Sequence, residues 1–545
     1  MKKAKTPLLA FLQKAYQIAA ASTKKGAPPA DELLDQAKER AWTRRKFLEK
    51  SGKAAVLTGM GGWLAGCNKE GALLSNLGGD ELTGSAKKKG KNEAKIAIVG
   101  AGIAGLHALH TLKQGGVNNV TLYEGSERVG GRIMTASNVM APGLKTEFGG
   151  EFIDTSHDDM LNLASYFGLT LLDTQASSEQ SLIKDAYFFN GQHYTLAQVI
   201  AEFEVIAPQM ESDIAQLSNN ITYWNHSAAD VFFDNQSIST YLTSIGCSGW
   251  LKELLEVAYE TEYGLSPTVQ SCINLLFLIS TDTSGGTFDI FGDSDERYKI
   301  AGGNQQIVDL LAGLYPSHIE TGRALTAIGK QGDGYLLHLS GYGQPKKFDY
   351  VLLTLPFTIL RNIDIQFTLP TWKQNAIDNL GYGTNAKLML GFTDRHWRGL
   401  GYTGYLFTDN GVQTGWDNSQ MQAGNTGPGG FTVYVGGQTG IDIGSGTAQS
   451  QASNYLPLLD QMFPGMQAKY NGNAARFHWP SYPWSLCSYA CYTTGQFTTV
   501  SGAERKTVDR LYFAGEHCSW NFQGYMNGAA HTGREAAEEI LDDLS

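Results

Sequence analysis

The sequence lacks several patterns that define other kinds of protein. Its six cysteines are scattered along 545 residues without a CxxC pair, which argues against a disulfide framework or a zinc site. Basic residues are outnumbered by acidic ones, with 42 lysines and arginines against 53 aspartates and glutamates. The resulting net charge of −11 argues against nucleic acid as a partner, because phosphate contacts need a basic face. Hydrophobic residues still make up 42% of the chain, which indicates a globular protein long enough for two or three domains.

The two signs of charge are unevenly distributed, and a cluster of positive residues lies at the start of the chain. Residues 1–53 carry a net charge of +8, whereas the remainder carries −19. Arg44 and Arg45 precede an apolar run over residues 54–65 that is too short and too rich in glycine to span a membrane. This pattern resembles a twin-arginine export signal. The run ends in Leu-Ala-Gly-Cys at residues 64–67, which resembles a lipoprotein signal-peptidase site.

The resemblance predicts an export leader over residues 1–67, carried by the twin-arginine export machinery, with a lipid anchor at Cys67. Residues 68–94 are rich in glycine, serine and lysine and are predicted to form a flexible tether. The expected location is the bacterial cell envelope, either periplasmic or extracellular, with a tether to the membrane if the lipid is attached. An arginine pair that happens to precede a buried helix is the alternative.

A dinucleotide-binding fingerprint follows the predicted tether. Residues 96–99 are apolar and β-branched, which predicts a buried strand. Gly100, Gly102 and Gly105 then form a G-x-G-x-x-G motif. The first glycine allows a tight turn, the second lets a pyrophosphate approach the backbone, and the third lets the next helix pack on the strand. The phosphate is expected at the start of that helix, where N–H groups and the helix dipole favour negative charge.

A second strand is predicted over residues 120–123 and ends at Glu124, 19 residues after Gly105. An acidic residue at this distance binds the ribose hydroxyls of a dinucleotide. The glycine motif alone is a weak signal. The order strand, helix, strand and acid together predicts a dinucleotide site.

The next glycine-rich segments indicate which dinucleotide is bound. The run Arg-Val-Gly-Gly-Arg at residues 128–132 resembles the second glycine signature of FAD-binding amine oxidases. This resemblance implies that Gly131 and Arg132 contact the flavin phosphates and ring. The run Glu-Phe-Gly-Gly that ends in Gly149 and Gly150 resembles the next flavin-contacting turn of the same family. Together these signatures favour FAD over NAD.

The end of the chain resembles the C-terminal signature of the flavin amine oxidase family. Residues 510–534 contain a short buried strand, then Gly515 and Glu516, then a helix that starts near Met526. The resemblance implies that Glu516 binds the ribityl chain. It also implies that the start of the helix faces the pyrimidine end of the flavin, where negative charge develops on reduction.

These signatures predict an α/β protein in which a Rossmann-like FAD-binding domain is combined with a discontinuous α+β substrate domain, the amine oxidase fold. The resemblance extends over roughly residues 95–540. Leu325 is assigned to the cofactor site through a predicted strand over residues 324–328. The FAD-binding domain is expected to comprise residues 95–154, 296–355 and 501–545, and the substrate domain residues 155–295, which look largely helical, and 356–500.

Three residues match positions of monoamine oxidases that take part in the reaction. Lys387 resembles the buried lysine that holds a water at flavin N5, where a cation stabilises the negative charge that forms on dioxygen. Tyr492 and Tyr525 match the two tyrosines of an aromatic cage, whose facing rings form a slot for the amine. A solvated lysine and two core tyrosines are the ordinary alternatives for these residue types.

Two neighbouring features bear on cofactor attachment and on substrate. Cys491 begins a Cys-Tyr-Thr-Thr run similar to the one that carries covalent flavin in monoamine oxidases, but Tyr489 and Ala490 replace its two glycines. Noncovalent FAD is therefore favoured, with Cys491 as a small core residue and covalent attachment as the alternative. Glu151 lies close to the point where L-amino-acid oxidases carry an arginine for the substrate carboxylate. Either the substrate lacks a carboxylate, or an arginine from elsewhere binds it.

The sequence therefore predicts an FAD-dependent oxidative deaminase of primary amines or L-amino acids. The products would be an imine, then an aldehyde or 2-oxo acid with ammonia, and hydrogen peroxide from dioxygen. No metal and no nucleic acid is expected as a partner, and a homodimer remains open. One alternative is a desaturase or isomerase acting on a carotenoid or protoporphyrinogen, which needs a wide apolar tunnel without a cage. A noncatalytic flavin-containing partner protein would have no use for an oxygen-facing Lys387.

Overall fold

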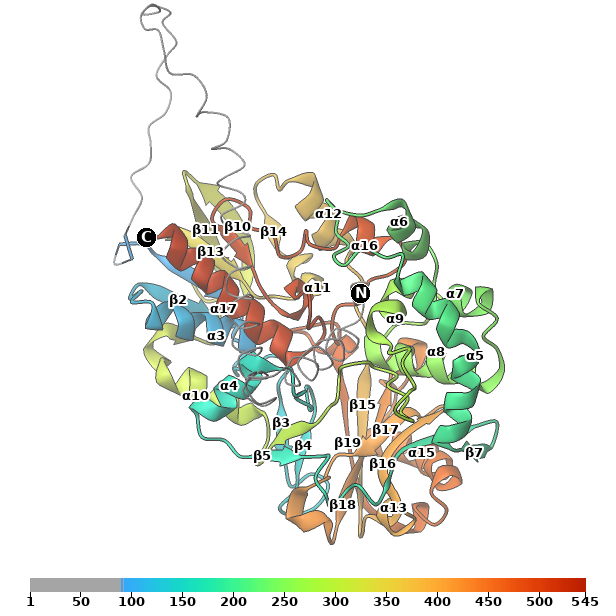
Figure 1. Cartoon of the computed structure of the whole chain (residues 1–545). Coiled ribbons are helices and arrows are strands. Elements are labelled where there is room, and N and C mark those ends of the chain that lie inside the picture. The colour runs from blue at the N-terminus through green and yellow to red at the C-terminus, as the bar shows by residue number, and fades with distance from the viewer. Residues whose placement is uncertain (1–89, 92) are drawn as a thin grey trace, which may run out of the picture. The chain divides into compact units, whose positions relative to one another are not determined.

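The computed structural model describes residues 90–91 and 93–545 (Figure 1). The predictions for the export leader over residues 1–67, for the lipid anchor at Cys67 and for nearly all of the tether lie outside the described residues.

A five-stranded parallel sheet forms the dinucleotide-binding part of the fold. Its strands follow the order β20-β13-β1-β2-β9, and all neighbours run parallel. Their bounds are β1 (Ile96–Val99), β2 (Val120–Tyr123), β9 (Ile319–Glu320), β13 (Tyr350–Leu353) and β20 (Leu511–Phe513). The three central strands are almost continuously apolar and buried, as expected for a parallel sheet covered on both faces. The sheet draws strands from all three segments that the sequence assigns to the cofactor domain.

The first and last helices of this part pack directly on each other (Figure 1). They are α3 (Ile103–Gln114), which follows β1, and α17 (Met526–Asp543), which follows β20. A side chain at Gly533 of α17 would meet the carbonyl oxygen of Ala104 at 2.1 Å. The glycine therefore lets the two helix backbones approach closely, and this contact joins the two ends of the described chain.

An ion-pair cluster holds α17 against α4 (Asp158–Tyr166). The Nδ1 atom of His531 lies 2.9 Å from Asp159, and the Nε2 atom lies 3.1 Å from Glu535. Arg534 donates to the same Asp159 carboxylate at 2.7 Å. Hydrogen bonds with Asp159 and then Glu535 raise the pKa of His531 to about 9. The protonated imidazolium therefore stabilises the folded chain.

This cluster makes stability depend on pH in a defined direction. Because the pKa of His531 is about 9 when folded and about 6.5 when unfolded, its contribution is complete below pH 6.5 and is lost as the pH rises through 9. We expect the free energy of unfolding to fall by roughly 1–2 kcal/mol more in the wild type than in His531→Gln between pH 6.5 and 9.5. Urea unfolding of both chains at the two pH values measures this difference. Parallel pH curves for the two chains would contradict it.

A second, seven-stranded sheet forms the substrate side of the fold, in the order β19-β15-β18-β17-β16-β6-β7. Its strands are β6 (Ile183–Phe189), β7 (Gln192–Tyr194), β15 (Ala386–Phe392), β16 (Tyr402–Thr408), β17 (Gln413–Asp417), β18 (Gly429–Val435) and β19 (Tyr470–His478). The only parallel pair among them, β6 with β16, joins the two sequence segments predicted for the substrate domain. Lys387 is the second residue of β15, a strand buried along its whole length.

The sequence predicts a largely helical segment over residues 155–295. Helices dominate its part over residues 196–278, whereas residues 171–194 contain the strands β5 (Leu171–Asp173), β6 and β7. The helices of residues 196–278 are α5 (Leu196–Ile214), α6 (Ala228–Asp234), α7 (Ile238–Ser244), α8 (Gly249–Tyr263) and α9 (Cys272–Leu278). The helix α8 ends at Gly264, which adopts the left-handed conformation that commonly terminates a helix. The chain turns at Gly264, and the last residues of α8 line the cavity described below.

The strand predicted for the cofactor domain over residues 324–328 belongs to a second sheet of that part of the fold. The strand predicted over residues 324–328 is β10 (Leu325–Gln331), which belongs to a four-stranded sheet in the order β12-β11-β10-β14. Its neighbours are β11 (Gly334–Leu339), β12 (Lys346–Phe348) and β14 (Asp364–Ile365). The two-residue strand β9 occupies the edge of the parallel sheet instead, and it is too short to leave a periodic pattern in the sequence.

Two general features concern the part of the chain that the structure describes. Every cysteine there is buried and unpaired: Cys247, Cys272, Cys487, Cys491 and Cys518. No helix among the described residues has the length and apolar character needed to cross a membrane.

Candidate active site

A cavity lies at the carboxyl ends of the parallel strands, where open α/β sheets bind their ligands. The residues that end or follow four of these strands line it: Val99, Glu124, Thr354 and Gly515. The cavity continues to the seven-stranded sheet, whose strands contribute Lys387, Trp416 and Tyr434 to its wall. The same cavity therefore connects the predicted cofactor residues with the predicted reaction residues.

The glycine motif shapes the turn between β1 and α3. Gly100 has φ +110°, a backbone conformation that disfavours other residues. A Cβ on Gly105 would lie 1.9 Å from the carbonyl oxygen of Gly100, so only glycine lets the helix pack on the turn. The helix α3 starts after Gly102 without a side-chain cap. Gly100 and Gly102 line the cavity, whereas Gly105 acts through packing.

Glu124 stands at the edge of this turn. Its carboxylate accepts hydrogen bonds from the backbone N–H of Ala101 at 2.8 Å and of Ser126 at 2.9 Å. These two bonds fix the carboxylate at the carboxyl end of β2, where it lines the cavity. This is the position expected of an acid that binds a ribose.

The second glycine signature packs against the first. The backbone N–H of Gly130 donates to the carbonyl of Ala101 at 2.7 Å, and both Gly130 and Gly131 have positive φ. Gly131 and Arg132 line the cavity. A Cβ on Gly149 would lie 1.8 Å from the carbonyl oxygen of Arg132, so the two predicted flavin-contacting turns touch at a position that admits only glycine.

An ion pair joins the beginning of the chain to its end. The Arg132 guanidinium donates to the Glu516 carboxylate at 2.8 Å and to the carbonyl of Ser488 at 2.7 Å. Glu516 also accepts from the backbone N–H of Gly524 at 3.0 Å. The structure therefore brings together two predicted cofactor residues that are 384 positions apart.

The remaining predicted cofactor residues line the same cavity: Gly150, Leu325, Gly515 and Met526. Gly150 lies against Met526, whose Cγ would be 2.6 Å from a Cβ at that glycine. Tyr525 precedes α17 and provides no side-chain cap for it. Two helix starts, of α3 and α17, are thus left uncapped by side chains at one cavity, where they can bind anionic groups.

Lys387 is buried in the wall of the cavity, as predicted, but its ammonium is fully engaged. It donates to the carbonyl of Gly149 at 2.9 Å, to the carbonyl of Glu147 at 3.2 Å and to the Glu151 carboxylate at 3.0 Å. A lysine ammonium has three protons, so these contacts use all of them. The other Glu151 oxygen lies 3.4 Å from a second buried ammonium, that of Lys299. Lys299 does not line the cavity.

Tyrosines form another part of the wall. The Tyr525 hydroxyl donates to the Glu262 carboxylate at 2.8 Å. The hydroxyls of Tyr434 and Tyr489 are 2.7 Å apart, and the Tyr489 hydroxyl also donates to the carbonyl of Thr261 at 3.0 Å. Tyr434, Tyr489 and Tyr525 all line the cavity. The ring of Tyr489 lies close to Gly524, beside the start of α17.

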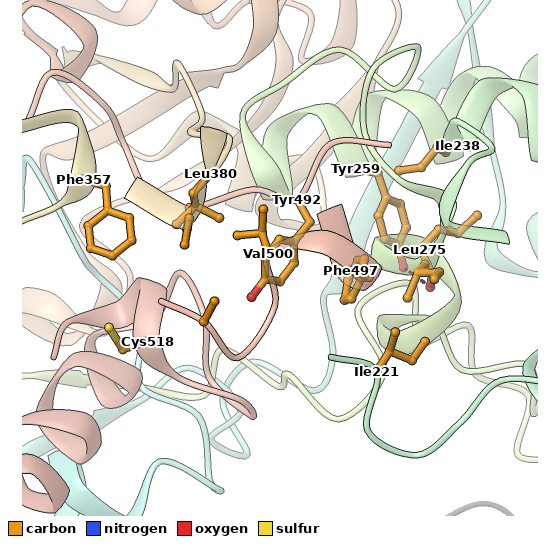
Figure 2. Close-up of a cluster of buried hydrophobic side chains, with 14 of the residues drawn as sticks. Ile221, Ile238, Tyr259, Leu275, Phe357, Leu380, Tyr492, Phe497, Val500 and Cys518 are labelled. Atoms are coloured by element: carbon orange, nitrogen blue, oxygen red, sulfur yellow. Dashed lines mark hydrogen bonds between the residues drawn. The ribbon is translucent and has the colours of Figure 1, made fainter. Parts of the chain in front are cut away.

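Tyr492 does not belong to this wall, and the prediction that it pairs with Tyr525 in a cage is wrong. Its ring lies in the hydrophobic core, 4.5 Å from that of Phe497 and close to Val500 (Figure 2). Its hydroxyl donates to the buried Glu504 carboxylate at 2.7 Å. Tyr489, three residues earlier, lines the cavity in its place.

Cys491 is also buried away from the cavity. Its thiol is completely inaccessible, and burial raises the pKa of this thiol well above its usual range. Its nearest polar neighbour is the Asn274 amide at 3.9 Å. This placement supports a core cysteine and noncovalent cofactor binding, and it provides no contact through which Cys491 could be attached to a group in the cavity.

Several residues of the cavity have no counterpart in the sequence prediction: Glu262, Glu296, Trp416, Tyr434 and Tyr489. Glu262 carried a readable signal. It lies seven residues after Leu255 and three after Tyr259 in α8, which places a carboxylate on the buried face of an amphipathic helix. Trp416 and Tyr434 sit in strands without a motif, so only the pairing of β17 with β18 brings them together.

These features fit a flavin dinucleotide. The glycine turns leave room for a close backbone approach, Glu124 stands at the carboxyl end of β2, and Arg132 with Glu516 joins the two chain ends over the cavity. The uncapped starts of α3 and α17 provide two places for negative charge.

The cavity lies at the carboxyl ends of a parallel sheet, and tyrosines and a buried lysine form another part of its wall. These features are those of an FAD-dependent oxidoreductase. The profile of the flavin containing amine oxidoreductase family matches residues 103–541. The chain therefore belongs to the flavin containing amine oxidoreductase family. Its cofactor is FAD, and it acts on amines.

Individual relatives and structures agree with this assignment. Human flavin-containing amine oxidase B is 24% identical over 476 residues, which cover 83% of this chain and 86% of the relative. The zebrafish (Danio rerio) flavin-containing amine oxidase is 23% identical over 474 residues, with the same coverage. Cyclohexylamine oxidase from Brevibacterium oxydans IH-35A superposes with a TM-score of 0.71 at 20% identity, covering 83% of this chain and 99% of that one. Wild-type putrescine oxidase bound to putrescine gives 0.70 at 18% identity, with coverage of 82% and 99%.

Substitution of the two tyrosines separates their roles. We expect Tyr489→Ala to lower kcat/KM for an amine about 10-fold, because it removes an aromatic face from the cavity. Tyr492→Phe should leave kcat/KM unchanged and lower the free energy of unfolding by about 1–2 kcal/mol, since Glu504 loses a buried donor. Steady-state kinetics and urea unfolding of both variants measure this. A loss of kcat/KM in Tyr492→Phe, with kcat/KM unchanged in Tyr489→Ala, would assign the cage position to Tyr492 instead.

Proposed function

We propose that this protein oxidises primary amines that carry no carboxylate next to the amine. In this reaction the amine gives up two electrons and two protons and becomes an imine, water hydrolyses the imine to an aldehyde and ammonia, and dioxygen is reduced to hydrogen peroxide. Bound FAD supplies the two-electron oxidation. The protein's own residues position the amine and exclude water.

The charge distribution of the cavity is the observation that carries this proposal. Three carboxylates line it where the tyrosines lie: Asp154, Glu262 and Glu296. The cations that line the cavity are Arg128, Arg132, Arg323 and Lys387. Arg132 and Lys387 are held by carboxylates. Arg128 and Arg323 have Nε atoms without a hydrogen-bond partner, but they lie at the second glycine signature and beside Glu124, on the cofactor side. Among the described residues, no unpaired cation therefore lines the cavity beside the tyrosines, where the carboxylate of an amino acid would have to be bound.

The partners of these cations are specific. Arg128 donates to the carbonyls of Val129 at 2.9 Å and of Ile133 at 3.2 Å. Arg323 lies 3.7 Å from Glu320, at the edge of the parallel sheet. Arg132 is held by Glu516, and Lys387 by Glu151. An incoming carboxylate would meet three acidic side chains instead of a cation, which is unfavourable in such a site.

The same lining counts against a desaturase or isomerase with an apolar polyene or tetrapyrrole substrate. Such a substrate would leave the carboxylates buried without a partner, at a free-energy cost of several kcal/mol. Export, a lipid anchor at Cys67 and a homodimer stay predictions of the sequence. The export hypothesis is compatible with a cofactor that is loaded before the folded protein crosses the membrane.

Peroxide release by the purified chain with bound FAD tests this function. We expect turnover with primary amines, and kcat/KM for L-amino acids lower by about 100-fold or more, because of the repulsion between carboxylates. Preferred turnover of L-amino acids would overturn the proposed substrate. Bleaching of the flavin absorbance by amines without peroxide would overturn dioxygen as the acceptor. An unchanged flavin spectrum with every amine would overturn amine oxidation itself.

A further inference from the structure

The three carboxylates form one connected group in the cavity wall. The Tyr525 hydroxyl donates to Glu262 at 2.8 Å and lies 3.3 Å from the Ser294 hydroxyl. Ser294 donates to Asp154 at 2.8 Å, and the other Asp154 oxygen accepts from the backbone N–H of Glu296 at 3.0 Å. Glu262 and Asp154 each accept a hydrogen bond from one of two adjacent hydroxyls, and Asp154 also binds the backbone of Glu296, although the three residues come from separate segments of the chain.

Glu262 has no cationic partner among the described residues. One of its oxygens accepts a hydrogen bond from the Tyr525 hydroxyl, and burial raises the pKa of this carboxyl to about 7. A buried carboxylate normally pairs with a cation, because its desolvation is otherwise uncompensated. The second oxygen of Glu262 is without such a partner beside a cavity that accepts a ligand.

The other two carboxylates are scarcely better compensated. His157 lies 3.3 Å from Asp154, but burial lowers the pKa of His157 to about 4, so its ring is neutral at pH 7. Burial raises the pKa of Glu296 to about 8, with Glu262 and Asp154 adding to the effect. Lys184 is the cation that acts on Glu296, but it interacts first with Asp185 and does not line the cavity.

The reacting amine does not supply the missing cationic partner. An amine is oxidised as the free base, since the nitrogen lone pair is needed for the imine. A substrate with one nitrogen therefore brings no positive charge at the moment of reaction. The carboxylates are compensated only if the substrate has another nitrogen that stays protonated.

We infer that the substrate is a diamine or polyamine, and that Glu262 and Glu296 bind the ammonium that is not oxidised. This inference rests on the proposed function and narrows it to one class of amine. Tyrosine faces in the same wall add to the attraction for an ammonium. An ammonium paired with these carboxylates would also favour their ionised form, so binding near neutral pH should release protons.

The test compares substrates of equal chain length with one or two nitrogens. We expect kcat/KM for 1,4-diaminobutane and 1,5-diaminopentane to exceed that for n-butylamine and n-pentylamine by about 30-fold or more, as expected for a buried charge pair. In Glu262→Gln this preference should fall below about 3-fold. Glu296→Gln should reduce it in the same direction, and it serves as the test if Glu262→Gln does not retain FAD.

Two control variants are matched to these substitutions. Glu260→Gln changes the same residue type two positions earlier in α8, at a carboxyl whose pKa burial also raises to about 7, but Glu260 does not line the cavity. Asp293→Asn changes an exposed carboxylate close to Glu296. Both should keep the wild-type preference for diamines.

The outcomes distinguish the inference from the function on which it rests. Equal kcat/KM for monoamines and diamines in the wild type, or an undiminished preference in both Glu262→Gln and Glu296→Gln, would overturn the inference while amine oxidation stands. Absence of flavin reduction with every amine of either class would overturn the proposed function.

Discussion

Replacement of Lys387 by methionine is expected to slow the recovery of the flavin absorbance by dioxygen about 100-fold, the effect of removing one preorganised charge from a reacting site. The reduction of the flavin by amine should change far less, because the hydrogen bonds of Lys387 go to backbone carbonyls and Glu151, and its ammonium reaches the Tyr434 ring only at 5.9 Å from the ring centre. Stopped-flow absorbance measures the two half-reactions separately.

A second buried lysine provides the control. Lys299 has the same exposure as Lys387 and binds the other oxygen of Glu151, but it does not line the cavity. Lys299→Met removes one positive charge from the same carboxylate and should leave the recovery rate within about 3-fold of the wild type, since the charge facing the cavity is kept. Equal slowing in the two variants would show that the unpaired Glu151 is responsible rather than the position of Lys387.

The second large effect is expected at Gly105, where replacement by alanine should prevent stable binding of FAD. The new methyl group would lie 1.9 Å from the carbonyl oxygen of Gly100, in a turn fixed on both sides by β1 and α3. The backbone must move to relieve this contact, and overpacking of this kind costs about 2–3 kcal/mol. The displaced turn is the one that the phosphates approach. The ratio of flavin to protein after gel filtration and the unfolding midpoint both report the change.

Gly313→Ala is the matched control, since it makes the same substitution in another helix. Gly313 lies in α10 (Gln305–Leu314), and a Cβ there would meet nothing within 4 Å. Alanine is favoured over glycine in a helix by about 1 kcal/mol, so this variant should bind FAD fully and be slightly more stable. Full retention of FAD by Gly105→Ala would contradict the packing role given to Gly105.

The cofactor half of the site could be predicted from the sequence because its residues act through local backbone geometry. Gly100, Gly102, Gly131 and Gly149 lie in turns whose shape depends on a few neighbouring residues, and a short motif records such a shape. Three strands of the parallel sheet, β1, β2 and β20, follow in the same way from short apolar runs that each precede a motif. The inner strand β13 and the two-residue strand β9 precede no motif and were not predicted from the sequence.

The substrate half was less predictable because tertiary pairing creates it. Tyr489 and Tyr492 are three residues apart in one loop segment, and the resemblance to a Cys-Tyr-Thr-Thr run assigned Tyr492 to the cavity, although Tyr489 lines it. The hydroxyl of Tyr489 meets that of Tyr434 only because β18 and the segment near residue 489 converge. The group formed by Asp154, Glu262 and Glu296 comes from three segments without a common motif. The three acidic residues were visible in the sequence, but their position in one cavity wall was not.

The pairing of the chain ends has a consequence for the order of events during synthesis. The strand β20 joins the parallel sheet through β13, and α17 packs on α3, so the sheet is incomplete until almost the whole chain has left the ribosome. Contacts between residues so distant in sequence also form slowly. A nascent chain that lacks residues 511–545 would contain the complete glycine fingerprint and still offer no Glu516 to Arg132. We therefore expect FAD to bind stably only once residues 511–545 are in place, and a chain that lacks them not to retain added FAD.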